Sequence, residues 1–145
     1  MERTLTTDAN NGIGREILVK GWVNSRRDHG GLIFIDIRDY CGVLQLTIQP
    51  EKADAFRVAS ELRDEFVISA TGTVKERSAE LRNPNLETGS VELVVSNITI
   101  LNKSEPLPIQ VNSTQTIGYD NRLKYRYLYL RRPKMQTMLK RRAEL

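Results

Sequence analysis

The chain has 145 residues, 39% of them hydrophobic and 28% charged, with a net charge of +4 at pH 7. These are ordinary values for a globular protein, and they argue against disorder along the whole chain. A single cysteine, Cys41, excludes internal disulfides and fits a reducing compartment, and no apolar run is long enough to cross a bilayer. One His and one Cys cannot form a zinc cluster. We therefore expect a cytoplasmic protein with no metal site and no membrane partner.

The positive charge is concentrated at the end of the chain. Residues 122–145 hold nine of the 22 Lys and Arg residues and one acid, Glu144. The first 121 residues hold 13 basic and 17 acidic residues, so this larger part is net negative. A nucleic-acid site there has to be local, built from a few side chains in defined positions.

Alternating apolar residues and turn residues predict five strands and one helix in the first 102 residues. We expect strands at 16–24, 32–38, 43–49, 65–75 and 90–101, and a helix at 50–63. Three strands, a helix and two strands follow one another in the oligonucleotide/oligosaccharide-binding (OB) fold, a small barrel in which a helix joins strands three and four. Gly21 and Gly72 suit the bends that such a barrel requires. We predict a mainly β protein with a five-stranded OB-fold barrel over residues 1–102, followed by a linker and a C-terminal helix.

The composition changes after residue 102. Residues 103–120 are polar and contain two X-Pro steps, which predicts a linker or hinge. Tyr125, Tyr127 and Tyr129 alternate with other residues, which favours an extended segment docked on another domain. Pro133 is suited to the first position of a helix that continues to the end of the chain. We expect residues 121–145 to be the start of a further domain in a longer protein.

The strand at 32–38 has an aromatic residue on its polar face. Side chains alternate along a strand, so the three isoleucines share one face and Phe34 lies on the other. Gln45 and Thr47 share the corresponding face of the next strand. A lone exposed ring often only covers a neighbouring loop. A ring beside an amide, however, can stack on an unpaired base while the amide hydrogen-bonds the base edge.

Four further residues can be assigned a binding or a structural role. Arg27 and His29 lie in the turn beside Phe34, where arginines in a net negative body favour phosphate or base contacts over a merely solvated turn. Glu92 on the fifth strand could accept hydrogen bonds from guanine, although a solvated strand residue is the simpler interpretation. Trp22 is expected to pack in the barrel or at its end and to have a structural role.

Four motifs together resemble a known family. They are Gly-Trp-Val-Asn at 21–24, Arg-Arg-Asp at 26–28, Leu-Ile-Phe-Ile-Asp-Ile-Arg-Asp at 32–39 and Arg-Leu-Lys-Tyr-Arg-Tyr-Leu at 122–128. The combination resembles the N-terminal part of bacterial-type aspartyl-tRNA synthetases, which are class II enzymes. The resemblance implies a barrel that binds the tRNA anticodon and a separate catalytic domain that activates aspartate with ATP and Mg²⁺. It implies a homodimeric parent enzyme, with no catalytic residue and no cofactor within these 145 residues.

The resemblance also implies roles for individual residues. Phe34 matches the ring that stacks on the middle anticodon base, a uracil, and Gln45 matches the amide that hydrogen-bonds this base. Glu92 matches the carboxylate that faces guanine at the first position. The other residues that fall where the family contacts anticodon bases or phosphates are Arg27, Arg63, Lys75, Arg77 and Asn83.

Two features bear on which tRNA is charged. His29 and the loop from Leu81 to Leu86 resemble relaxed members of the family, which charge tRNA-Asn as well as tRNA-Asp. The anticodons of these tRNAs differ only in the third letter. Tyr129 departs from the family pattern, which has Asp at this position.

Other functions remain open at this stage. A free-standing barrel could bind single-stranded nucleic acid without base preference, and a structural barrel could serve only subunit contact. Lysyl- and asparaginyl-tRNA synthetases are near alternatives within the resemblance because they share the central uracil. Residues 32–39 favour the aspartyl enzyme.

Overall fold

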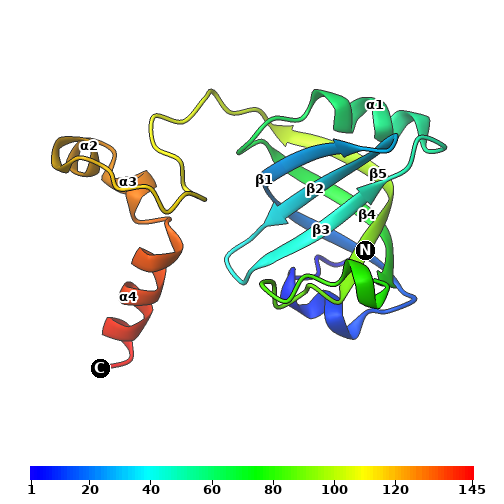
Figure 1. The fold of residues 1–145 in the computed structure, drawn as a ribbon, viewed down its shortest axis with the longest axis horizontal. Helices are drawn as coiled ribbons and strands as arrows, with labels where there is room; N and C mark the ends of the chain where they lie inside the picture. Colours follow the sequence, from blue (N-terminus) through cyan, green and yellow to red (C-terminus); the bar gives the residue numbers. More distant parts are fainter. The chain divides into compact units, whose positions relative to one another are not determined.

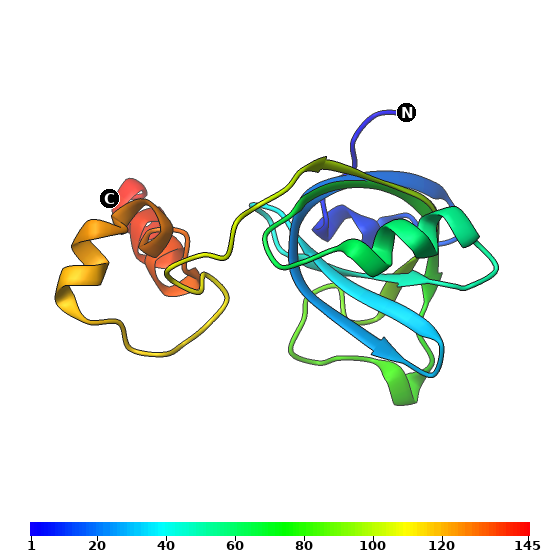
Figure 2. The same cartoon turned by 90° about the horizontal axis from the view of Figure 1, so that it is seen from above.

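Five strands close into a barrel in the order β1-β2-β3-β5-β4 (Figure 1). They are β1 (Glu16–His29), β2 (Leu32–Arg38), β3 (Val43–Ile48), β4 (Val67–Glu76) and β5 (Val91–Asn102). Neighbouring strands are antiparallel except β3 and β5, whose parallel pairing closes the ring. Helix α1 (Ala53–Glu61) joins β3 to β4, and seen from above it lies across the barrel (Figure 2). The predicted OB-fold barrel is confirmed.

The computed structural model describes residues 1–145, which divide into two compact units, Met1–Ser104 and Glu105–Leu145. Each unit has a hydrophobic cluster of its own. No helix is both long enough and apolar enough to span a membrane.

Two strands differ from their predicted bounds by more than one residue, for local reasons. β1 continues past Asn24 to His29 because residues from Ser25 onward pair with β2 after a register shift. β4 begins later than predicted because Glu65 has a φ of 66°, which interrupts the extended backbone. Arg38 donates to both carboxylate oxygens of Glu65 at 2.8 Å and holds this residue in place.

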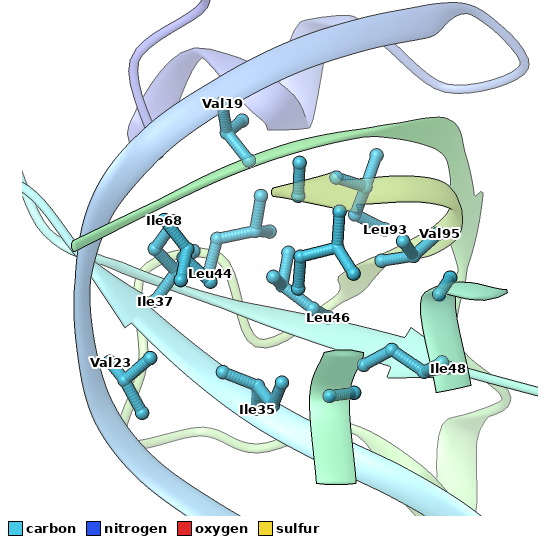
Figure 3. Packing of buried hydrophobic residues seen from close by; sticks show 14 of the residues in the cluster. Val19, Val23, Ile35, Ile37, Leu44, Leu46, Ile48, Ile68, Leu93 and Val95 are labelled. Carbon is cyan, nitrogen blue, oxygen red and sulfur yellow. The ribbon is translucent and has the colours of Figure 1, made fainter. Parts of the chain in front are cut away.

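The barrel interior is aliphatic, as strand alternation predicts. Ile33, Ile35 and Ile37 of β2 are at most 2% exposed. Figure 3 shows Ile35 and Ile37 packed with leucines and valines of the other strands. Helix α1 adds Ala55 and Ala59 at one end of this cluster. Full burial of an aliphatic side chain of this size contributes about 1.5–3 kcal/mol, so the interior is the main source of barrel stability.

Two glycines lie where strand backbones approach closely. A Cβ atom on Gly21 would come within 2.3 Å of the carbonyl oxygen of Arg38, and one on Gly72 within 2.2 Å of that of Val94. Only glycine fits such contacts without backbone movement. These close contacts between strands explain why glycine occurs at Gly21 and Gly72 in a small barrel.

Trp22 does not pack in the interior. Its side chain lies on the outer face of β1 and is 36% exposed, whereas Val23 next to it is fully buried. Trp22 was expected in the barrel or at its end, and the interior position is wrong because strand alternation gives the inward position to its neighbour.

The second unit contains α2 (Tyr119–Lys124), α3 (Arg126–Tyr129) and α4 (Pro133–Ala143). The extended segment predicted from the alternating tyrosines is wrong, because Leu128 and Tyr129 both donate backbone hydrogen bonds to the carbonyl of Tyr125. Leu128 is buried with Ile109 and Val111, so burial of one helical face outweighs the strand-like alternation. Pro133 is the first residue of α4, as predicted.

A buried carboxylate ties the N-terminal segment to the barrel end opposite α1 (Figure 1). This segment includes η1 (Thr7–Asn11), a 3-10 helix. Asp39 accepts hydrogen bonds from the Thr6 hydroxyl at 2.7 Å, from the Thr6 amide at 2.9 Å, and from the amides of Cys41 and Gly42. Burial alone would raise the pKa of Asp39, but these four hydrogen bonds outweigh it and lower the pKa below its usual value.

We predict that Asp39→Asn lowers the free energy of unfolding at pH 7 by roughly 1.5–3 kcal/mol, since hydrogen bonds to a charged acceptor are lost. A lowered folded-state pKa means that the carboxylate stabilises the fold fully above the unfolded value near 3.8. This stabilisation is lost as the pH falls through the folded-state pKa. The free energy of unfolding of the wild type and of Asp39→Asn is measured by urea unfolding at pH 7 and at successively lower pH. The difference between the two free energies should therefore shrink as the pH falls. A difference that does not shrink as the pH falls below 3.8, or an equal loss in the exposed control Glu51→Gln, would contradict this role.

Candidate nucleic-acid interface

Strand pairing arranges the outer face of β1, β2 and β3 in rows. Arg27 lies opposite Phe34, and Phe34 lies opposite Thr47. In the adjacent row, Ser25 lies opposite Asp36, and Asp36 lies opposite Gln45. Side chains of cross-strand partners lie within reach of one another. The half-buried Phe34 is thus surrounded by polar and charged side chains.

Three members of these rows, Arg27, Phe34 and Gln45, line a groove of about 380 Å³. The residues that line the groove are Arg27, Asp28, His29, Phe34, Gln45, Arg77, Leu81 and Glu92. Seven of them were predicted as site residues, and only Asp28 was not. Chain segments that are distant in sequence therefore meet at one hollow on the barrel surface.

Four predicted residues do not line the groove. Lys75 is exposed and lies opposite Glu92 in the β4–β5 pair, next to the groove. Asn83 and Leu86 are half-buried in the β4–β5 loop, where the Leu86 amide donates to the Asn83 carbonyl. Arg63 precedes β4, so the whole ten-residue strand separates it from Arg77. The structure does not bring Arg63 to the groove.

A hydrogen-bonded chain of polar side chains runs along the groove floor. Arg27 Nη2 donates to Gln45 Oε1 at 3.3 Å, and Gln45 Nε2 donates to Glu92 Oε2 at 3.3 Å. Asp36 pairs with Arg27 at 3.3 Å and accepts from the Ser25 hydroxyl at 2.8 Å. These contacts hold the groove side chains in place before any ligand arrives.

The simpler interpretation of Glu92 as a solvated strand residue is wrong. Its carboxylate is half-buried and also accepts a 2.6 Å hydrogen bond from the Thr47 hydroxyl. Gln45 and Thr47 are 7% and 5% exposed, although they lie on the outer face. The sequence prediction missed Thr47 and Asp36, whose signal was their shared face with Phe34 and Gln45.

Arg77 contributes a donor that is not used within the protein. Its Nε atom is buried and has no hydrogen-bond partner. Leaving a buried donor unpaired costs about 1–3 kcal/mol, and because this atom is covered, a ligand could pair with it only if the Arg77 side chain moved. Leu81 lies nearby on η2 (Ala79–Leu81), is 63% exposed and offers an apolar contact at the rim.

The groove chemistry suits an unpaired base better than a run of phosphates. An aromatic ring provides a stacking surface, and an amide and a carboxylate provide directional hydrogen-bonding groups beside it. Glu92 in the groove and Asp28 at its edge would repel phosphates, while Arg27 and Arg77 supply positive charge. No group of three or more His, Cys, Asp or Glu side chains could hold a metal ion.

A closed five-stranded barrel with such a groove on its outer face defines the class of OB-fold nucleic-acid-binding domains. Residues 17–101 match the model of the tRNA anticodon family, an OB-fold nucleic acid binding domain, and the chain belongs to this family.

Curated relatives extend the likeness beyond the barrel. The chain is 50% identical over 133 residues to aspartate–tRNA(Asp/Asn) ligase from Sulfurovum sp. (strain NBC37-1), covering 91% of this chain and 23% of the relative. It is 51% identical over 124 residues to the ligase of the same name from Endomicrobium trichonymphae, covering 86% of this chain and 21% of the relative. The chain thus spans less than a quarter of the length of these relatives.

A solved structure shares the fold. The aspartyl-tRNA synthetase from Entamoeba histolytica superimposes with a TM-score of 0.84 at 17% identity, covering 97% of this chain and 34% of that protein. At this identity the likeness concerns the fold alone.

We predict that Phe34→Ala weakens binding of a labelled RNA stem-loop by roughly fivefold or more, because loss of base stacking costs about 1–3 kcal/mol. A fluorescence titration at fixed salt measures the effect. Tyr40→Ala removes a ring that is 70% exposed and does not line the groove, and it should leave the affinity unchanged. Equal affinity of the wild type and Phe34→Ala would contradict a stacking role for Phe34.

Proposed function

We propose that this chain is the anticodon-binding domain of an aspartate–tRNA ligase that charges both tRNA-Asp and tRNA-Asn. One observation carries the proposal: Phe34, Gln45 and Glu92 come from three strands and line one groove. The names of the two ligase relatives support the choice of tRNA. A barrel that binds single strands without base preference would not need the hydrogen-bonded amide and carboxylate.

The middle anticodon base would stack on Phe34 and be read by Gln45. Arginine has only donors and an ionised carboxylate has only acceptors, so Arg27 and Glu92 orient the Gln45 amide in one direction. One N–H of Gln45 Nε2 is then left for a carbonyl oxygen of the base. Uracil has two carbonyl groups beside its N–H, and it can pair with an amide oriented in this way.

The first anticodon base would be read by Glu92. A carboxylate accepts hydrogen bonds and donates none when ionised, so it favours a base edge that presents N–H groups. Guanine presents a ring N–H and an exocyclic amine side by side, and a carboxylate can accept from both. Each well-placed pair of hydrogen bonds discriminates against a wrong base by about 1–3 kcal/mol.

The third base would lie near His29 and the loop that carries Leu81. Both side chains are exposed and line the groove. A neutral imidazole has one donor and one acceptor nitrogen, so it can face either the amine of cytosine or the carbonyl of uracil. This chemistry supports relaxed recognition of the letter in which the two tRNAs differ. Lys75, Asn83 and Leu86 remain proposed contacts to bases or phosphates around the loop. Arg63 is not among them, because the whole of β4 separates it from Arg77.

In this proposal, the attachment of aspartate to tRNA is carried out by the longer protein and not by these 145 residues. Its use of ATP and Mg²⁺, its homodimeric state and its cytoplasmic location are proposals that follow from the aspartate–tRNA ligase assignment. Since no set of side chains in residues 1–145 fits a metal ion, we assign no step of the ATP chemistry to this chain.

Base-specific binding tests the proposed function directly. We predict that a stem-loop with the anticodon GUC binds the 145-residue chain at least tenfold more tightly than the same stem-loop with the loop sequence scrambled, measured at equal salt. Phosphate contacts are identical in the two RNAs, so the difference reports base reading. Equal affinities would favour a barrel without base preference.

Relaxed specificity is tested with the longer protein. We predict that kcat/KM for aspartylation of tRNA-Asn lies within a hundredfold of the value for tRNA-Asp, because His29 can face either third base. A hundredfold difference corresponds to about 2.7 kcal/mol of transition-state stabilisation. A stronger preference for tRNA-Asp would show a strict enzyme and contradict the relaxed assignment.

A further inference from the structure

Thr47 lies beneath the groove without lining it. It is opposite Phe34 across the β2–β3 pair and opposite Val94 across the β3–β5 pair, and it is 5% exposed. Its hydroxyl donates to Glu92 at 2.6 Å, within the short range of hydrogen bonds to an ionised oxygen. A ligand in the groove would therefore meet Glu92 and not Thr47.

Both internal donors of Glu92 reach the same oxygen atom. Thr47 Oγ1 and Gln45 Nε2 donate to Oε2, at 2.6 Å and 3.3 Å. The terminal torsion of a glutamate side chain is soft, so without such contacts its carboxylate samples a broad range of orientations. Because both donors bind Oε2, the Glu92 carboxylate keeps a narrow range of orientations, and Oε1 remains as the acceptor for a ligand.

Thr47 is better suited than Gln45 to hold the Glu92 carboxylate in one orientation. Its hydrogen bond is the shorter of the two, and its β-branched side chain has few rotamers on a strand. In the proposed function, Gln45 also has to hydrogen-bond the middle base with its second N–H, so the position of its amide depends on the RNA as well as on Glu92. The buried Thr47 hydroxyl has no such second task, so its contact can persist while RNA is bound.

We propose that Thr47 is a positioning residue for base recognition: its hydroxyl orients the Glu92 carboxylate so that Oε1 accepts from the exocyclic amine of the base in the groove. The inference rests on the proposed function, in which this base is guanine. It assigns part of the selectivity at the first anticodon position to a residue that does not contact the RNA.

Inosine in place of guanine tests the inference, since it lacks only the exocyclic amine. We expect the wild-type 145-residue chain to bind the GUC stem-loop roughly tenfold more tightly than the IUC stem-loop, as for one hydrogen bond to a charged group. In Thr47→Val this ratio should fall to threefold or less, through weaker binding of the guanine loop alone. Thr47→Ser keeps the hydroxyl and should keep the ratio.

Two further variants support the comparison. Thr99→Val is the matched control, because Thr99 is exposed on β5 and lies outside the groove, and it should leave both affinities unchanged. Thr47→Ala removes the hydroxyl without placing a methyl group against the carboxylate. It should behave like Thr47→Val, so the test holds even if the valine variant folds poorly.

The outcomes separate the two proposals. A wild-type chain that binds the guanine and inosine loops equally would overturn the assignment of Glu92 in the proposed function, and the role of Thr47 with it. A normal wild-type ratio that persists in both Thr47→Val and Thr47→Ala would overturn only the positioning role. An equal loss of affinity for both loops, or a serine variant that loses the ratio, would also overturn it.

Discussion

The parallel pairing of β3 with β5 is the contact on which the groove depends. It closes the barrel, and it places Glu92 beside Gln45, although 47 residues separate them in the chain. The pairing is stabilised from within by fully buried side chains such as Leu46 and Leu93. The same closure that completes the hydrophobic interior therefore assembles the polar side chains on the outer face.

The groove is prepared for a ligand by contacts within the protein. Arg27, Gln45 and Glu92 form a hydrogen-bonded chain, and Thr47 and Asp36 hold its members from below and from the side. Ordering these side chains in advance reduces the entropy lost when an RNA binds. One buried donor, Arg77 Nε, has no partner within the protein. This arrangement explains how a barrel with a net negative body can bind a polyanion through a local site.

Much of the fold was predictable because the period of two along each strand is a local property. The faces assigned to Phe34 and Glu92 are those that the structure has. An extended segment was wrongly predicted for the tyrosines near residue 127, because alternation over a few residues can occur by chance. Burial of Leu128 favours a helix there. Trp22 was misassigned because the size of a side chain does not determine its face. Most predicted site residues line the groove, and their roles stay predictions until binding is measured.

The order of the strands along the chain, the side chains that face outward and the resemblance that pointed to an anticodon could all be predicted from the amino-acid sequence. Each of these depends on residues that are neighbours along the chain or on one strand. The hydrogen bond from Thr47 to Glu92, the use of Oε2 by both internal donors and the position of Arg63 outside the groove are visible only in the folded protein. The two hydrogen bonds to Glu92 join β3 to β5 across a parallel pair, so their geometry depends on how the whole barrel closes.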